Sequence, residues 1–309
     1  MKILLTGSTG LVGKNILDKY PKGYSYTLLT PNSKDLNLLE YSEVLDFFKI
    51  HKPDYVIHAA GVVGGIQANI NYPVRFLVEN TQIGNNLILA ASKMMKTQIL
   101  NIGSSCMFPK FATNPLKEES LLSGMLEPTN EGYAIAKIYA QRLCTYLNYE
   151  LGEIRFKTVI PCNLYGKWDK FSSEWGHMIP AVIQKIHKAT MEQQTEVSIW
   201  GDGMARREFM YASDFADFIW FAIANFATLP ELMNVGLGKD YSINEYYQVI
   251  AEVIGFRGTF VHDLSKPVGM NQKLVDTSKM LQVGWKHKTT LSAGIEETYN
   301  YYKTINNAL

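Results

Sequence analysis

A glycine-rich turn lies between a short apolar strand and a helix at the start of the chain. Residues 2–6 form the predicted strand, and residues 10–20 form the predicted helix. Gly7 permits a sharp turn, Gly10 lets the backbone approach a pyrophosphate, and Gly13 lets the helix pack closely on the strand. The helix N-terminus offers free N–H groups and the positive end of its dipole. The segment therefore predicts a dinucleotide-binding turn, which consists of Gly7, Ser8, Thr9, Gly10, Leu11, Val12 and Gly13.

Predicted strands and helices keep alternating through the first half of the chain. Short apolar runs at residues 26–29, 55–60, 98–102 and 157–161 indicate strands, and residues 41–51, 73–95 and 132–150 indicate helices. Such alternation implies parallel strands joined by right-handed crossovers. We therefore predict an α/β fold in which residues 1–165 form a Rossmann-type, doubly wound parallel sheet that binds the dinucleotide.

The pattern is looser in residues 166–309, which we expect to form mainly a smaller C-terminal cap that binds substrate. Residues 166–176 indicate a loop, residues 178–190 a helix and residues 197–200 a strand. Another helix is predicted over residues 213–226, with Ser213 or Asp214 as its N-cap, and two helical patterns close the chain. The chain is expected to return to the first domain near residues 205–240. A cap of this kind covers the carboxyl edge of the sheet, where open α/β sheets bind ligands.

Composition excludes several classes of function. The formal net charge of +1 over 309 residues argues against a nucleic-acid or membrane-surface partner, because both need clustered basic residues. No apolar run approaches the about 20 residues that a membrane span requires, and the N-terminus has no signal-peptide pattern. The three cysteines have no metal-ligand spacing, so we predict no metal site and a reducing, cytoplasmic location.

The end of the second predicted strand bears on the choice between NAD and NADP. An acidic residue there would hold the ribose hydroxyls and repel a 2′-phosphate. This chain has no acid between Leu29 and Lys34, and the first one is Asp35. Lys34 can pair with a 2′-phosphate, although it can equally be a solvated loop lysine. NADP(H) is therefore the favoured cofactor, with NAD(H) as the alternative.

Three side chains predict reductase chemistry. Tyr133 and Lys137 are four residues apart and share one face of a predicted helix, where the ammonium can lower the pKa of the phenol. Ser104 follows a predicted strand and can polarise a carbonyl beside that phenol. Cys106 and His177 add a thiol and an imidazole, which can form a second acid/base pair. The simpler alternatives are a small buried cysteine and a histidine that caps a helix.

These motifs resemble the extended short-chain dehydrogenase/reductase family. Longer stretches resemble the GDP-L-fucose synthase family within it, and the resemblance covers nearly the whole chain. These stretches are residues 63–69, 103–110, 126–137, 163–166, 177–181, 200–203 and 207–209.

The resemblance implies roles for individual residues. Ser104, Tyr133 and Lys137 match the catalytic serine, the proton donor and the lysine that tunes it, and Cys106 and His177 match the pair that moves protons during epimerisation. Residues matching substrate-nucleotide positions are Lys185, Trp200, Arg207 and Lys273. Residues matching the cofactor site beyond the turn are Ile102, Gly103, Ser104, Ser105, Lys137, Pro161, Cys162, Asn163, Leu164 and His177.

Three positions depart from the family's pattern. An arginine that meets the 2′-phosphate is missing around Thr30 and Pro31. The usual Lys-Pro-Asp-Gly is Lys266-Pro267-Val268-Gly269, which lacks a carboxylate for substrate hydroxyls. Phe108 replaces the usual tyrosine.

The resemblance implies a bifunctional enzyme that epimerises GDP-4-keto-6-deoxy-D-mannose at C3 and C5 and then reduces C4 with NADPH, giving GDP-L-fucose. One alternative is a relative that acts on another GDP-4-ketosugar, such as the precursor of colitose or of a 6-deoxyheptose. A second alternative is a nucleotide sensor that kept the fold and lost catalysis. The resemblance also implies a homodimer formed through residues 73–95 and 132–150, although the apolar faces of these helices can equally belong to the core.

Overall fold

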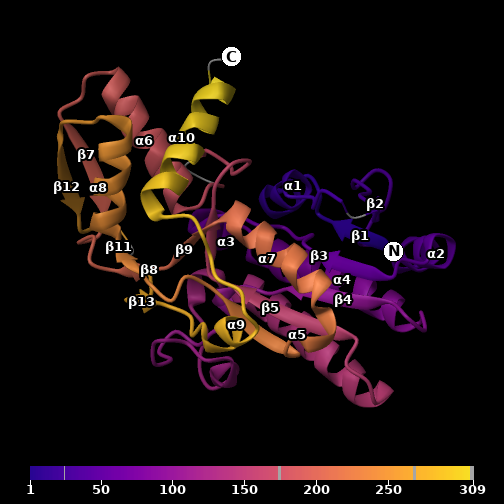
Figure 1. Ribbon diagram of the computed structural model, residues 1–309. Coiled ribbons are helices and arrows are strands. Elements are labelled where there is room, and N and C mark those ends of the chain that lie inside the picture. Colours follow the sequence, from indigo (N-terminus) through magenta and orange to yellow (C-terminus); the bar gives the residue numbers. More distant parts are fainter. Residues whose placement is uncertain (24, 173–174, 267–268, 307–309) are drawn as a thin grey trace.

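A parallel six-stranded sheet forms the centre of the larger lobe (Figure 1). The computed structural model describes residues 1–23, 25–172, 175–266 and 269–306. The strand order is β10-β5-β4-β3-β1-β2, and every neighbouring pair is parallel. The prediction of a doubly wound α/β sheet is therefore confirmed. The strands are β1 (Lys2–Thr6), β2 (Thr27–Leu29), β3 (Tyr55–His58), β4 (Gln98–Ile102), β5 (Phe156–Pro161) and β10 (Leu232–Val235).

Helices cover both faces of this sheet because alternate strand residues point to opposite sides. Ile3 and Leu5 of β1 belong to the core beneath α1 (Leu11–Asp18) and α7 (Ala212–Ala224). Leu4 belongs to the core on the other face, which is covered by α2 (Tyr41–His51), α4 (Pro73–Ser92) and α5 (Glu131–Leu151). The short helix α3 (Ile66–Asn71) precedes α4. The turn after β1 consequently lies at the switch point, where the strand order reverses between β1 and β3.

A smaller lobe has a hydrophobic core of its own. Its helices α6 (Met178–Met191) and α8 (Ile243–Ile254) lie beside the parallel pair β7 (Glu196–Trp200) and β12 (Thr259–Asp263), as Figure 1 shows. Helix α10 (Leu291–Asn306) packs against α8. Between the lobes lie the pair β6 (Asn163–Tyr165) and β9 (Phe209–Tyr211), and a small sheet of β11 (Tyr241–Ser242), β8 (Arg206–Arg207) and β13 (Gln272–Lys273). Helix α9 (Ser278–Gln282) follows that sheet in the chain.

Two local predictions differ from the structure. Helix α7 begins at Ala212 with Tyr211 as its N-cap, so the predicted cap at Ser213 or Asp214 is wrong. The Asp214 carboxylate instead accepts hydrogen bonds from the backbone and hydroxyl of Thr289, each at 2.8 Å. Helix α8 was not predicted, although Ser242 and Glu245 form a capping box at its start.

Two further points concern membrane-spanning helices and the position of Val268. No helix in the described part of the chain is both long and apolar enough to cross a membrane. The sequence difference at Val268 lies outside the residues that the structure describes.

Candidate active site

The turn after β1 has the shape that a pyrophosphate requires. Gly7 has a φ of +72°, and a Cβ atom there would lie 2.6 Å from the Ala59 carbonyl oxygen at the end of β3. Gly10 is the N-cap of α1, and within the described residues no side chain caps that helix. A Cβ atom on Gly13 would collide with the backbone of Gly7 and Ser8. The first turn of α1 can therefore bind phosphate oxygens through backbone N–H groups, so these residues fit a dinucleotide.

The segment after β2 leaves one lysine available for a 2′-phosphate. Asp35 accepts a hydrogen bond from the Asn32 backbone at 3.1 Å, and Asn32 Oδ1 accepts one from the Lys34 backbone at 2.8 Å. The Asp35 carboxylate is thus used inside its own turn. The Lys34 side chain is exposed, which suits a 2′-phosphate ligand.

The serine, tyrosine and lysine meet where β4 ends. Ser104 caps a 3₁₀ turn at Ser105–Met107, and its Oγ accepts a hydrogen bond from the Cys106 backbone at 3.3 Å. Lys137, only 7% exposed, donates from Nζ to the Ile102 carbonyl at 2.8 Å, and burial lowers its pKa to about 8. Burial raises the pKa of Tyr133, with the nearby Cys106 adding to the rise and a hydrogen bond to Ser104 opposing it. The pKa of this phenol is thus raised and not lowered as predicted, which favours the protonated form.

The Cys106 thiol lies beside two hydrogen-bond donors from distant parts of the chain. Asn130 Nδ2 is 3.2 Å from Sγ, and Lys273 Nζ is 3.8 Å from it. Lys273 is 7% exposed and pairs in register with Arg207 across β13 and β8. Burial lowers the pKa of Arg207, and the charges of Glu127 and Cys106 act in the opposite direction. A thiolate at this position would accept charge-assisted hydrogen bonds.

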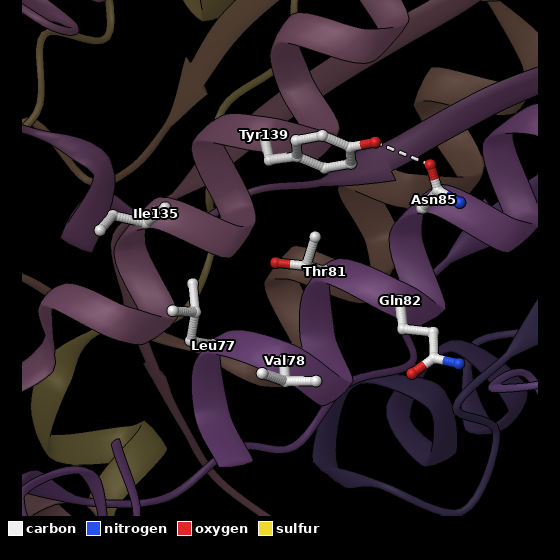
Figure 2. Close-up of a pocket in the computed structure, with 7 residues that line it drawn as sticks. All are labelled: Leu77, Val78, Thr81, Gln82, Asn85, Ile135 and Tyr139. Carbon is white, nitrogen blue, oxygen red and sulfur yellow. Dashed lines mark hydrogen bonds between the residues drawn. The ribbon is translucent and has the colours of Figure 1, made fainter. Parts of the chain in front are cut away.

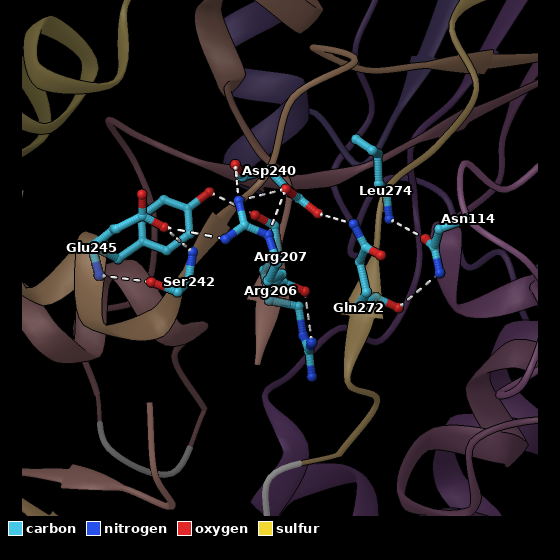
Figure 3. A network of polar contacts seen from close by, with 9 residues as sticks. Asn114, Arg206, Arg207, Asp240, Ser242, Glu245, Gln272 and Leu274 are labelled. Atoms are coloured by element: carbon cyan, nitrogen blue, oxygen red, sulfur yellow. Dashed lines mark hydrogen bonds and ion pairs between the residues drawn. The ribbon is translucent and has the colours of Figure 1, made fainter. Parts of the chain in front are cut away.

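A polar network fixes the strand that carries Lys273 (Figure 3). Asp240 accepts from Arg206 Nε at 2.9 Å and from Gln272 Nε2 at 2.6 Å, which ties β8 to β13. On the other side, Asn114 Oδ1 accepts from the Leu274 backbone at 2.8 Å. The strand is consequently held by contacts on both sides of Lys273.

His177 and Cys106 have different neighbours: His177 lies beside Asp169, whereas Cys106 lies beside Asn130 and Lys273. His177 is the N-cap of α6, is about one-third exposed at 32%, and its Nδ1 lies 3.8 Å from Asp169 Oδ1. The segment matched to the nicotinamide side of the cofactor runs from Pro161, where β5 ends, into β6. There Cys162 is buried, and Asn163 Nδ2 donates to the Glu208 carbonyl at 2.9 Å.

The four residues matched to the substrate nucleotide fall into two groups. Arg207 and Lys273 lie near Cys106, whereas Lys185 and Trp200 belong to the smaller lobe. Lys185 Nζ donates to the Ser198 carbonyl at 2.5 Å and to its hydroxyl at 3.0 Å. Trp200 ends β7 with an exposed ring, and the Lys266 ammonium lies 5.8 Å from the ring centroid.

Sequence reasoning assigned no role to Asn130 or Asp169, which contact Cys106 and His177 in the structure. Asn130 stands three residues before Tyr133, so its place in that motif was the available signal. Among the described residues, no three His, Cys, Asp or Glu side chains cluster as metal ligands.

A phosphate-binding turn at the switch point of a doubly wound sheet, with serine, tyrosine and lysine at the same edge, defines a nicotinamide-dependent enzyme of the Rossmann class. The chain belongs to the NAD dependent epimerase/dehydratase family, which matches residues 3–236. The resemblance inferred from the motifs is thereby confirmed.

Individual relatives cover nearly the whole chain. The GDP-L-colitose synthase of Yersinia pseudotuberculosis is 56% identical over 302 residues, which are 98% of each chain. The GDP-L-fucose synthase of Azorhizobium caulinodans is 44% identical over 305 residues, which are 99% of this chain and 97% of the relative. A solved structure of a Campylobacter jejuni GDP-mannoheptose C4 reductase with NADP bound has a TM-score of 0.88 and 31% identity, covering 98% of both chains.

Proposed function

We propose that this protein is an NADP(H)-dependent epimerase and reductase of a GDP-4-keto-6-deoxyhexose. The observation that carries the proposal is the Cys106 thiol, which lies between the donors of Asn130 and Lys273 and next to Ser104 and Tyr133. A plain reductase needs only the serine, tyrosine and lysine. A thiol with its own donors adds a base, and the ketone at C4 acidifies the protons on the neighbouring carbons.

Each side chain then has one task. Cys106 removes the proton from C5, and His177 returns one from the opposite face of the sugar. Bound NADPH supplies the hydride for C4. Tyr133 protonates the oxygen at C4, Ser104 holds that oxygen through a hydrogen bond, and Lys137 stays fixed by the Ile102 carbonyl.

The smaller lobe, residues 166–309 apart from the return near 205–240, is proposed to bind the GDP part. The exposed Trp200 ring offers a stacking surface for guanine, and Arg207 and Lys273 supply positive charge for the diphosphate beside Cys106. Lys185 of α6 donates to Ser198 of β7, the strand that ends at Trp200, so its charge lies on the proposed guanine side of the site.

NADP(H) is the proposed cofactor. No acid follows β2 before Asp35, Lys34 is exposed, and a relative of 31% identity has been solved with NADP bound.

The 56% identity to a GDP-L-colitose synthase favours the 3-deoxy substrate, the precursor of GDP-L-colitose, as the first candidate. Colitose lacks the 3-hydroxyl group, so only C5 needs inversion. GDP-4-keto-6-deoxy-D-mannose, which requires inversion at C3 and C5, is the second candidate, supported by 44% identity to a GDP-L-fucose synthase.

Turnover of each ketosugar in D₂O, with NADPH or NADH and NMR of the product, tests the proposal. We expect deuterium at C5 of GDP-L-colitose, and at C3 and C5 of GDP-L-fucose if the second substrate is accepted. The ratio of the two kcat/KM values identifies the substrate. A product that is reduced without inversion, or no turnover of either ketosugar, would contradict the proposal.

Two substitutions separate the two activities. Cys106→Ser should abolish exchange at C5, whereas Tyr133→Phe should abolish reduction and leave exchange at C5 in place. Cys144→Ser is the matched control, because that thiol is buried in the core beneath α5, away from Ser104. Normal epimerised product from Cys106→Ser would show that another group is the base.

A homodimer is proposed to form through α4 and α5. These helices pack side by side, and an open pocket of about 440 Å³ between them is lined by the residues in Figure 2. Val78, Ile135 and Tyr139 are exposed there, and Tyr139 donates to Asn85 Oδ1 at 2.7 Å. Covering such an apolar face stabilises an interface.

Sedimentation of Ile135→Glu tests this interface, with Ile154→Glu as control, because Ile154 is also an exposed isoleucine. We expect a monomer from the first variant and a dimer from the control. Equal sedimentation coefficients for the two variants would contradict the proposed interface.

A cytoplasmic location is also proposed, because Cys106, Cys144 and Cys162 are all free thiols.

A further inference from the structure

A buried carboxylate lies next to the imidazole of His177. The Asp169 side chain is 4% exposed, and its Oδ1 lies 3.8 Å from His177 Nδ1. Oδ1 accepts a hydrogen bond from the Lys170 backbone at 2.8 Å. Within the described residues, Asp169 Oδ2 and His177 Nδ1 are buried without a hydrogen-bond partner.

An unpaired buried carboxylate is costly, so this arrangement needs a compensating group. Among the described residues, the imidazole of His177 lies within ion-pair distance of Asp169. Asp169 Oδ1 and His177 Nδ1 lie slightly too far apart for a hydrogen bond. Catalytic hydrogen bonds are often long before substrate binds. An approach of about 1 Å would bring His177 Nδ1 within hydrogen-bond distance of the Asp169 carboxylate.

The segment that carries Asp169 is attached on both sides to the proposed cofactor site. Asn15 of α1 donates to the Lys167 carbonyl at 2.9 Å, and Trp168 Nε1 donates to Asp18 Oδ2 at 2.9 Å. Lys170 Nζ donates to the Val63 carbonyl at 3.3 Å. The carboxylate is therefore fixed relative to α1 and the segment after β3, while His177 starts α6 in the smaller lobe.

We infer that Asp169 is a positioning residue for His177. Its carboxylate accepts the Nδ1–H of the imidazolium, which fixes the ring and leaves the Nε2–H for the sugar. The proton balance is simple. The Cys106 thiolate takes the C5 proton and becomes a thiol, the electron pair remains in the enolate of the ketosugar, and Nε2–H protonates C5 from the other face. His177 is then neutral, with its remaining proton on Nδ1 facing Asp169.

This inference rests on the proposed function, and two measured rates test it separately. The first is deuterium exchange at C5 of the ketosugar with retention, measured with NADP⁺, which requires only Cys106. The second is formation of inverted, reduced product with NADPH, which also requires His177. We expect Asp169→Asn to reduce the second rate by about 10- to 100-fold, as loss of a charge-assisted hydrogen bond implies, and to leave the first within about twofold.

Asp18→Asn is the matched control, because it weakens the attachment of the same segment through Trp168 without contacting the imidazole. Its two rates should keep the parent ratio. In Asp169→Glu, which keeps the carboxylate, product formation should recover in part. In a His177→Asn background, Asp169→Asn should cause no further loss, because Asp169 acts through the ring.

Equal losses of both rates in Asp169→Asn, or losses that add in the double variant, would overturn the inference. So would a product rate in Asp169→Asn equal to that of the parent. If Asp169→Asn does not fold, the Asp169→Glu rates in the parent and His177→Asn backgrounds decide in the same way. An inactive parent enzyme would instead contradict the proposed function.

Discussion

Replacing Lys273 with methionine removes the cation beside the proposed base. The ammonium is 7% exposed and lies 3.8 Å from the Cys106 sulfur, while Asn130 remains at 3.2 Å. At this separation two charges attract by about 4 kcal/mol at an effective dielectric constant of 20, an upper limit. Hydrogen bonds to charged groups contribute about 1.5–3 kcal/mol net. If the ammonium stabilises the Cys106 thiolate by about 2–3 kcal/mol, we expect deprotonation at C5 to slow by about 30- to 150-fold in Lys273→Met.

The assay is deuterium exchange at C5 at saturating ketosugar. Lys185→Met is the comparison, since that ammonium is bound by Ser198 instead of the thiol. It should act mainly on KM, whereas Lys273→Met should act on the exchange rate itself. If Lys273→Met raises KM and leaves exchange at saturation unchanged, Lys273 binds the nucleotide only, and the reasoning about the thiolate is refuted.

Three further predictions concern the cofactor site and stability. Gly7→Ala should abolish NADPH binding in a fluorescence titration, because its Cβ would collide with the Ala59 carbonyl, whereas Gly152→Ala, with a similar positive φ and open space, should bind normally. Lys34→Ala should raise KM for NADPH about fivefold and leave KM for NADH unchanged, as expected for about 1 kcal/mol from an exposed ion pair; equal effects on both would contradict the phosphate contact. Burial, aided by the charge of Lys137, lowers the pKa of His58 to about 3. Between about pH 6.5 and pH 3 the unfolded chain therefore binds a proton at His58 that the folded chain does not, and stability falls as the pH falls. Between pH 6.5 and 5, urea unfolding should show a loss about 2 kcal/mol larger for the parent than for His58→Gln, and parallel losses would contradict this assignment.

The sheet was predictable because its strands are continuous apolar runs separated by helical periods. The prediction for residues 98–102 matches β4, and that for residues 73–95 overshoots the end of α4 at Ser92 by three residues. Helix ends depend on local capping, which explains such small errors. The cap of α7 was predicted wrongly because Thr289, 75 residues away, binds the Asp214 carboxylate.

The surroundings of the thiol were not predictable from local patterns. Strands β8 and β13 have two residues each, too few for a periodic signal, and they are joined through Asp240. The contact between Cys106 and Lys273 spans 167 positions. The resemblance matched Lys273 to the nucleotide, and only the fold brings it to the sulfur.

Helix α5 carries the proposed donor and the proposed contact surface on the same two turns. Tyr133 and Lys137 alternate along it with Ile135 and Tyr139. The last two are exposed and line the pocket in Figure 2. A small molecule wedged against Ile135 and Tyr139 could therefore shift the phenol without competing with either substrate. Inhibitors that bind at this surface of α5 should be noncompetitive with both substrates. They should also lose potency as the enzyme concentration rises.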